Sequence, residues 1–171
     1  MSRPLALTIG EPAGIGPDIA LVAWARRGKF SLPAFYILGD PAYLARRAAR
    51  LGLEVPIETV EPSATLKVFA RALPVVTLGL AAKAEPGKPD DTSAPLAIAA
   101  IDRAVTDVVD GTAAAMVTNP VAKSVLYRAG FEEPGHTEYL GKLAFEKTGN
   151  PAWPVMMLWS PEVAVVPVTI H

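Results

Sequence analysis

Residues 10–18 read Gly-Glu-Pro-Ala-Gly-Ile-Gly-Pro-Asp and follow directly on a short apolar run, Leu5–Ile9. A short, nearly continuous apolar run is typical of a buried strand. Pro17 suits the first turn of a helix, because the N–H that proline lacks has no partner there. The segment therefore predicts a strand, a tight loop over residues 10–16 and a helix that continues to about Arg27.

The same alternation of apolar runs and helical stretches continues along the chain. Further strands are predicted at Phe35–Leu38, Ile57–Val60, Pro74–Thr77 and Ala113–Val117, and a closing pair of strands at Val155–Trp159 and Val163–Thr169. Helices are expected between them, after a cap at Asp40, around Ile98–Val108, up to Gly130 and after a cap at Thr137. This order favours an α/β layered fold with a mainly parallel sheet. The loop-like segment 84–95 is a candidate domain crossover or mobile arm.

Composition excludes several classes of protein. The 171 residues carry 16 Lys+Arg against 17 Asp+Glu, so no basic excess is available for a nucleic acid or an anionic membrane. A hydrophobic share of 51% with 19% charged residues is too apolar for a disordered chain. The absence of Cys rules out disulfides, and no secretory signal or membrane-spanning segment is seen. We expect a soluble, cytoplasmic protein with no nucleic-acid or membrane partner.

The loop over residues 10–16 has two interpretations. Its glycines could bring the backbone close to an anion at a helix N-terminus. Alternatively, they could only allow a strand-to-helix turn with unusual φ angles. The sequence matches neither the G-x-G-x-x-G fingerprint nor a P-loop.

Three later residues are candidates for a binding site. Lys123 follows Thr118-Asn119-Pro120 in the first turn of a helix, where it is either an anion ligand or a solvated surface lysine. His136, beside Thr137 at a helix start, could hold a phosphate or be an ordinary loop histidine. His171, at the end of a strand, is a weak candidate metal ligand. No serine-hydrolase motif is present.

Five segments, taken in order, resemble the 4-hydroxythreonine-4-phosphate dehydrogenase (PdxA) family. They are residues 10–18, Val-Thr-Asn-Pro-Val-Ala-Lys at 117–123, Ala-Gly-Phe-Glu-Glu-Pro-Gly-His-Thr-Glu at 129–138, Met-Met-Leu at 156–158 and Val-Thr-Ile-His at 168–171. The resemblance extends from Leu5 to His171. It implies a three-layer α/β/α fold like that of isocitrate and isopropylmalate dehydrogenases, whose G-D-G-I-G-P-E loop is similar to residues 10–17.

The resemblance also implies an activity and a site. The activity is a metal-dependent, NAD- or NADP-linked oxidation and decarboxylation of 4-phosphooxy-L-threonine, a small phosphorylated hydroxy-amino acid, in pyridoxal 5'-phosphate (vitamin B6) biosynthesis. The implied cation is divalent (zinc, magnesium or cobalt), and the implied assembly is a homodimer with its active site at the interface. His136 and Thr137 match substrate-binding positions, and His171 matches the first of three histidine metal ligands. No residue is assigned to catalysis or cofactor binding.

Length adds a further expectation. Because family members are close to twice as long, we expect residues 1–171 to be the N-terminal part of a two-domain enzyme whose C-terminal part is absent, and to be inactive alone. Three alternatives remain open at the sequence level. They are a paralogue that oxidises 4-phospho-threonate or 4-phospho-erythronate, a non-catalytic phosphate-binding module, and a phosphate acyltransferase of similar architecture.

Overall fold

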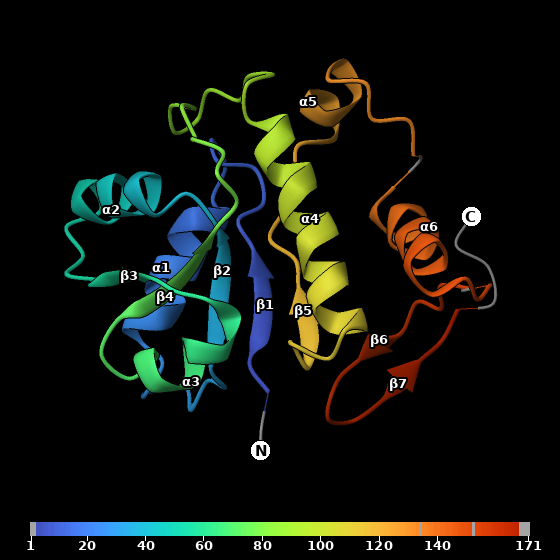
Figure 1. Cartoon of the computed structure of the whole chain (residues 1–171), viewed down its shortest axis with the longest axis horizontal. Coiled ribbons are helices and arrows are strands. Elements are labelled where there is room, and N and C mark those ends of the chain that lie inside the picture. The colour runs from blue at the N-terminus through green and yellow to red at the C-terminus, as the bar shows by residue number, and fades with distance from the viewer. Residues whose placement is uncertain (1–2, 134, 152, 168–171) are drawn as a thin grey trace. The chain divides into compact units, whose positions relative to one another are not determined.

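Five short apolar segments form one parallel sheet in the computed structural model, which describes residues 3–133, 135–151 and 153–167 (Figure 1). The chain divides into two compact units, Met1–Glu132 and Glu133–His171, and the sheet belongs to the first. The strands are β1 (Leu5–Thr8), β2 (Phe35–Gly39), β3 (Ile57–Thr59), β4 (Leu73–Thr77) and β5 (Ala115–Val117), in the spatial order β3-β4-β2-β1-β5. The prediction of a mainly parallel sheet is confirmed.

Helices connect these strands and cover both faces of the sheet. They are α1 (Gly16–Ala25), α2 (Pro41–Arg50), the 3-10 turn η1 (Pro62–Ala64), α3 (Thr65–Val68), α4 (Ala94–Val109) and α5 (Lys123–Arg128). Figure 1 shows α4 in front of β1 and β5, and α1 behind the sheet. Helix, sheet and helix make the three layers of an α/β/α unit.

The strand order places a change of direction beside β1. From β1 the chain builds β2, β3 and β4 on one side, and α4 then carries it back to β5 on the other side. Leu5 of β1 therefore pairs with Phe35 of β2 and with Ala115 of β5. In open parallel sheets, ligands bind at such a switch point, outside the carboxyl ends of the strands. The loops after β1 and β5 meet at this point.

Local sequence explains how α2 begins. The Asp40 side chain accepts hydrogen bonds from the backbone N–H groups of Ala42 and Tyr43, at 2.8 and 3.2 Å. Its second oxygen accepts a 3.0 Å bond from the N–H of Ala82, in the loop after β4. The predicted cap is therefore confirmed, and the same residue also fixes a distant loop.

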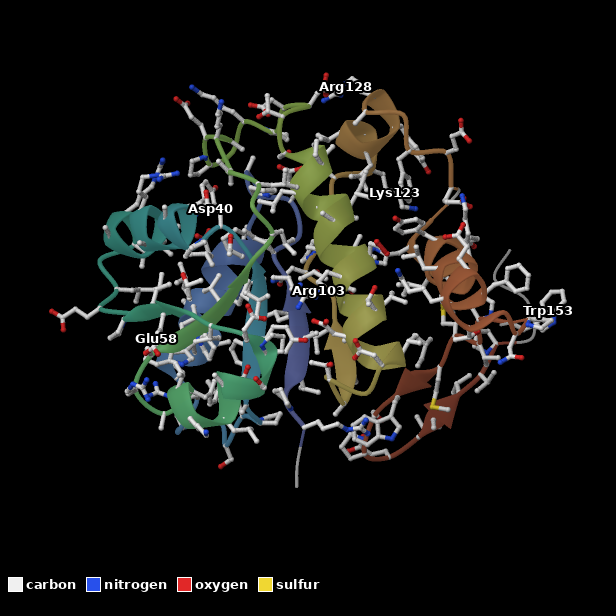
Figure 2. The ribbon with its side chains drawn as sticks, in the orientation of Figure 1. Asp40, Glu58, Arg103, Lys123, Arg128 and Trp153 are labelled. Atoms are coloured by element: carbon white, nitrogen blue, oxygen red, sulfur yellow. The ribbon has the colours of Figure 1, made fainter. Side chains whose placement is uncertain are left out.

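The core of the first unit lies between the sheet and its helices. All five residues of β2 are buried. One buried polar link crosses this core, where the Tyr36 hydroxyl donates a 2.6 Å bond to Asp107 on α4. Arg103, one turn earlier on α4, donates a 2.7 Å bond to the other Asp107 oxygen (Figure 2). Burial and the Asp107 hydrogen bond raise the pKa of Tyr36 far above its ordinary value.

The second unit holds one helix and a small hairpin. Its elements are α6 (His136–Thr148), β6 (Leu158–Trp159) and β7 (Ala164–Val165), and the two strands pair antiparallel. The predicted closing pair of strands is confirmed in shorter form, as a hairpin, and the end of the predicted second strand lies outside the described residues. Within the described ranges, no helix is long and apolar enough to cross a bilayer.

Candidate functional site

The glycine loop after β1 packs tightly against the loop after β5. The Glu11 N–H donates a 2.9 Å hydrogen bond to the Pro120 carbonyl. Gly10 has φ +71°, and a Cβ there would lie 2.6 Å from the same carbonyl oxygen. A Cβ on Gly16 would lie 2.7 Å from the Ile9 carbonyl oxygen. These two glycines are therefore required by close backbone packing, which supports the turn interpretation of the loop.

Charge at the start of α1 disfavours an anion there. Asp18 lies in the first turn of the helix, where its carboxylate already interacts favourably with the helix dipole. Arg47 of α2 donates to both Asp18 oxygens, at 2.5 and 2.7 Å, and to the Gly14 carbonyl at 2.8 Å. The Arg47 guanidinium therefore donates its hydrogen bonds to the loop over residues 10–16 and to Asp18, and it is not directed at a phosphate.

A tyrosine adds a second support under the loop. The Tyr43 hydroxyl donates a 2.5 Å bond to the Pro12 carbonyl and accepts a 3.3 Å bond from Arg47. Burial raises the pKa of Tyr43, which keeps this hydroxyl a donor at neutral pH. Together, Tyr43 and Arg47 fix the loop from below.

Glu11 is the functional candidate that sequence reasoning missed. Only 4% of this residue is exposed. Its Oε1 accepts a 3.0 Å bond from the Ala13 N–H, whereas its Oε2 is buried with no hydrogen-bond partner in the part of the chain that the structure describes. The signal in the sequence was an acidic residue directly after the first glycine of a strand-end loop, where a buried carboxylate needs a reason.

Glu11 borders a cavity at the carboxyl ends of β1 and β5. The cavity has a volume of about 360 Å³ and is lined by residues of three loops, 11–15, 87–89 and 120–122. The loop over residues 87–89 is held in place because the Gly87 N–H donates a 2.7 Å bond to the Ala13 carbonyl. The cavity thus lies at the switch point of the sheet, where ligands of this fold class bind.

The loop after β5 places Asn119 and Lys123 differently. Asn119 is buried, and its side chain donates a 2.9 Å bond to the Thr8 carbonyl, so its role is to join β1 to this loop. Lys123 is the first residue of α5, as predicted, and is exposed (Figure 2). Helix α5 has only six residues, so its dipole contributes little to the electrostatic potential around Lys123.

In the second unit, the helix starts two residues earlier than predicted, because its N-cap is Gly135 and not Thr137. His136 is the first residue of α6, and Gly135 precedes it as an N-cap without a side-chain hydrogen bond. Thr137 therefore lies inside the first turn and does not cap the helix, which corrects the sequence-based expectation. Both residues are half-buried, and Glu138 in the same turn is exposed. The backbone N–H groups of this turn lack acceptors within the helix.

The proposed metal ligand, His171, lies outside the described residues. Among the residues that the structure does describe, no group of three or more His, Asp or Glu side chains could hold a metal ion.

The chain is similar in sequence to proteins of known name. The family model described as "Pyridoxal phosphate biosynthetic protein PdxA" matches residues 31–171. A 4-hydroxythreonine-4-phosphate dehydrogenase of Bradyrhizobium diazoefficiens is 58% identical over 99% of this chain and 51% of its own length. That of Methylorubrum populi is 55% identical over 99% of this chain and 49% of its own length.

Solved structures give the same picture. The crystal structure of a 4-hydroxythreonine-4-phosphate dehydrogenase from Burkholderia phymatum matches with a TM-score of 0.84 at 26% identity, covering 99% of this chain and 50% of the other. The chain thus spans about half the length of the relatives that it matches.

Proposed function

The chain belongs to the PdxA family, and from this premise we propose that the protein oxidises and decarboxylates 4-phosphooxy-L-threonine for pyridoxal 5'-phosphate biosynthesis. The observation that carries the proposal is the 58% identity over 99% of the chain to a protein named for this dehydrogenase activity. The α/β/α fold, shared with a solved structure of the same name, supports it. The electron acceptor in this proposal is NAD or NADP.

The proposed roles of the chain's own residues are to bind and orient the substrate. His136 and Thr137 begin α6, where the backbone N–H groups of the first helical turn and an imidazole can hold phosphate or carboxylate oxygens. The exposed carboxylate of Glu138 opposes an anion in this turn, but solvent screens it. A bound nicotinamide dinucleotide would supply the hydride acceptor for this oxidation.

The metal and the assembly rest on the family resemblance. We propose His171 as one ligand of a divalent cation, with zinc, magnesium and cobalt as candidates. Replacing His171 by alanine should remove metal-dependent activity without unfolding the protein, and unchanged activity would exclude His171 from the site.

We also propose a cytoplasmic homodimer. Trp153 and Trp159 are 88% and 72% exposed, and apolar surface of this kind is commonly covered by a partner.

A substrate comparison tests the proposal. The full-length protein, supplied with NAD+ or NADP+ and a divalent cation, should reduce the dinucleotide faster with 4-phosphooxy-L-threonine than with 4-phospho-threonate or 4-phospho-erythronate. His136→Ala should raise the Michaelis constant about tenfold, equivalent to roughly 1.4 kcal/mol. Preference for either phospho-sugar acid would contradict the proposed substrate, and an unchanged Michaelis constant would remove His136 from the site.

A further inference from the structure

We propose that the Glu11 carboxylate accepts a hydrogen bond from the NH2 group carried by an aromatic ring, bound in the cavity at the carboxyl ends of β1 and β5. Such a ring is present at both ends of a nicotinamide dinucleotide, as the nicotinamide carboxamide and as adenine. The inference rests on the proposed function, since it assigns one part of the cofactor to residues of this chain.

The two oxygens of the Glu11 carboxylate differ in their hydrogen bonding. Glu11 is 4% exposed, and one of its oxygens is satisfied by the Ala13 N–H. The other oxygen is buried without a hydrogen-bond donor among the residues in the described ranges. A buried carboxylate oxygen that has lost water and gained nothing is unfavourable. A ligand that supplies one donor would remove this cost, which makes the site selective for a donor group.

The cavity beside Glu11 has the volume and the mainly apolar lining of a small-molecule site. Its volume of about 360 Å³ falls in the range, roughly 300–1,000 Å³, that is usual for small-molecule sites. Ile15, Pro89 and Val121 contribute to its walls, and such side chains suit the faces of a flat ring. A mainly apolar cavity with one fixed polar group is a common arrangement for binding and orienting a ring.

Neither a phosphate nor a metal cation suits this cavity. A phosphate in the cavity would meet the carboxylate of Glu11, which opposes a second negative charge. A metal cation prefers several oxygen ligands, and the described residues place no group of three or more acidic or histidine side chains together. An uncharged NH2 group on an aromatic ring satisfies the free oxygen without either conflict.

Backbone hydrogen bonds link the loops that line the cavity. The Glu11 backbone is tied to Pro120, and the Gly87 backbone is tied to Ala13, by bonds of 2.9 and 2.7 Å. The three loops that line the cavity are therefore linked before any ligand arrives. A preformed site loses little conformational entropy on binding.

Glu11→Gln isolates the free carboxylate oxygen. The variant keeps the size of the side chain, and its remaining oxygen can still accept the Ala13 N–H. Its new NH2 group then faces the ligand NH2, so two donors oppose each other. We expect the dissociation constant for NAD+, measured by calorimetry on the full-length protein, to rise at least tenfold. The matched control is Glu58→Gln, an exposed carboxylate on β3 that pairs with Arg71, which should leave the constant unchanged.

Thermal unfolding without ligand separates binding from a structural role. Because the free Glu11 oxygen has no donor, Glu11→Gln should keep or raise the melting temperature of the ligand-free protein. A lowered melting temperature would mean that the carboxylate supports the fold and would overturn the inference. Binding of nicotinamide mononucleotide and of AMP identifies the ring, because only the fragment that contacts Glu11 should lose affinity in the variant.

The inference and the proposed function fail in different ways. If the full-length protein oxidises 4-phosphooxy-L-threonine and Glu11→Gln binds NAD+ with an unchanged dissociation constant, only the role of Glu11 is overturned. If the unmodified protein binds neither NAD+ nor NADP+, the proposed function is overturned together with it.

Discussion

Arg47 holds the site loop through one cluster of buried contacts, and replacing it tests how that loop is positioned. Its guanidinium contacts both oxygens of Asp18, the Gly14 carbonyl and the Tyr43 hydroxyl. The side chain of Arg47 is 6% exposed and that of Asp18 is 28% exposed. Arg47→Met keeps the apolar stem and removes the charge and all of these hydrogen bonds.

The size of the effect follows from this burial. Removing one partner of a buried ion pair costs roughly 3–5 kcal/mol, because the other charge remains buried without a partner. Since Asp18 is partly exposed, water can solvate it once the arginine is gone, and the cost should fall near the lower end, about 3 kcal/mol. For a chain of this length, that corresponds to a fall in melting temperature of about 6–12 °C.

The assay is urea unfolding followed by circular dichroism, with an exposed ion pair as the control. Arg71 also donates to both oxygens of Glu58, from one nitrogen, but the two side chains are 60% and 41% exposed. Arg71→Met should therefore cost about 0–1 kcal/mol. Adding Asp18→Asn to Arg47→Met should recover part of the loss, because it removes the unpaired carboxylate. Equal losses in Arg47→Met and Arg71→Met would refute the reasoning.

Two further predictions concern packing and pH. Gly16→Ala should cost about 1–3 kcal/mol in thermal unfolding, because its Cβ would lie 2.7 Å from the Ile9 carbonyl oxygen, whereas Gly28→Ala has no atom within 4 Å to meet and should change stability by less than about 0.5 kcal/mol. A larger loss in Gly28→Ala would contradict this. Burial raises the pKa of Tyr36 in the folded state above its ordinary value of 10.0, so the neutral phenol contributes stability that is present below pH 10 and lost as the pH rises above it. Tyr36→Phe should flatten this alkaline decline in denaturation midpoints, and an equally steep decline would contradict the assignment.

Much of the fold could be predicted because its signals are local. The apolar runs at β1, β2 and β4 and the cap at Asp40 all depend on neighbouring residues, and the structure confirms them. The turn and short helix at 62–68 were not predicted, since Pro62 and Thr65 are buried by contacts that no local pattern encodes. The strand order was also beyond reach, because strand pairing depends on long-range contacts.

The site was predicted less completely. The two loops at the carboxyl ends of β1 and β5 were identified, because glycine, proline and asparagine mark such turns. The importance of Glu11 was not, since its burial and its free oxygen arise only when three loops meet. For Lys123 the sequence left two interpretations open, an anion ligand and a solvated surface lysine, and its exposure on a short helix favours the second.

The stoichiometry of the reaction tests the proposed activity most directly. With 4-phosphooxy-L-threonine, NAD+ or NADP+ and a divalent cation, the full-length protein should release one CO2 for each dinucleotide reduced. Both products should disappear when the substrate, the dinucleotide or the cation is omitted. A folded protein that forms no reduced dinucleotide under these conditions would contradict the account.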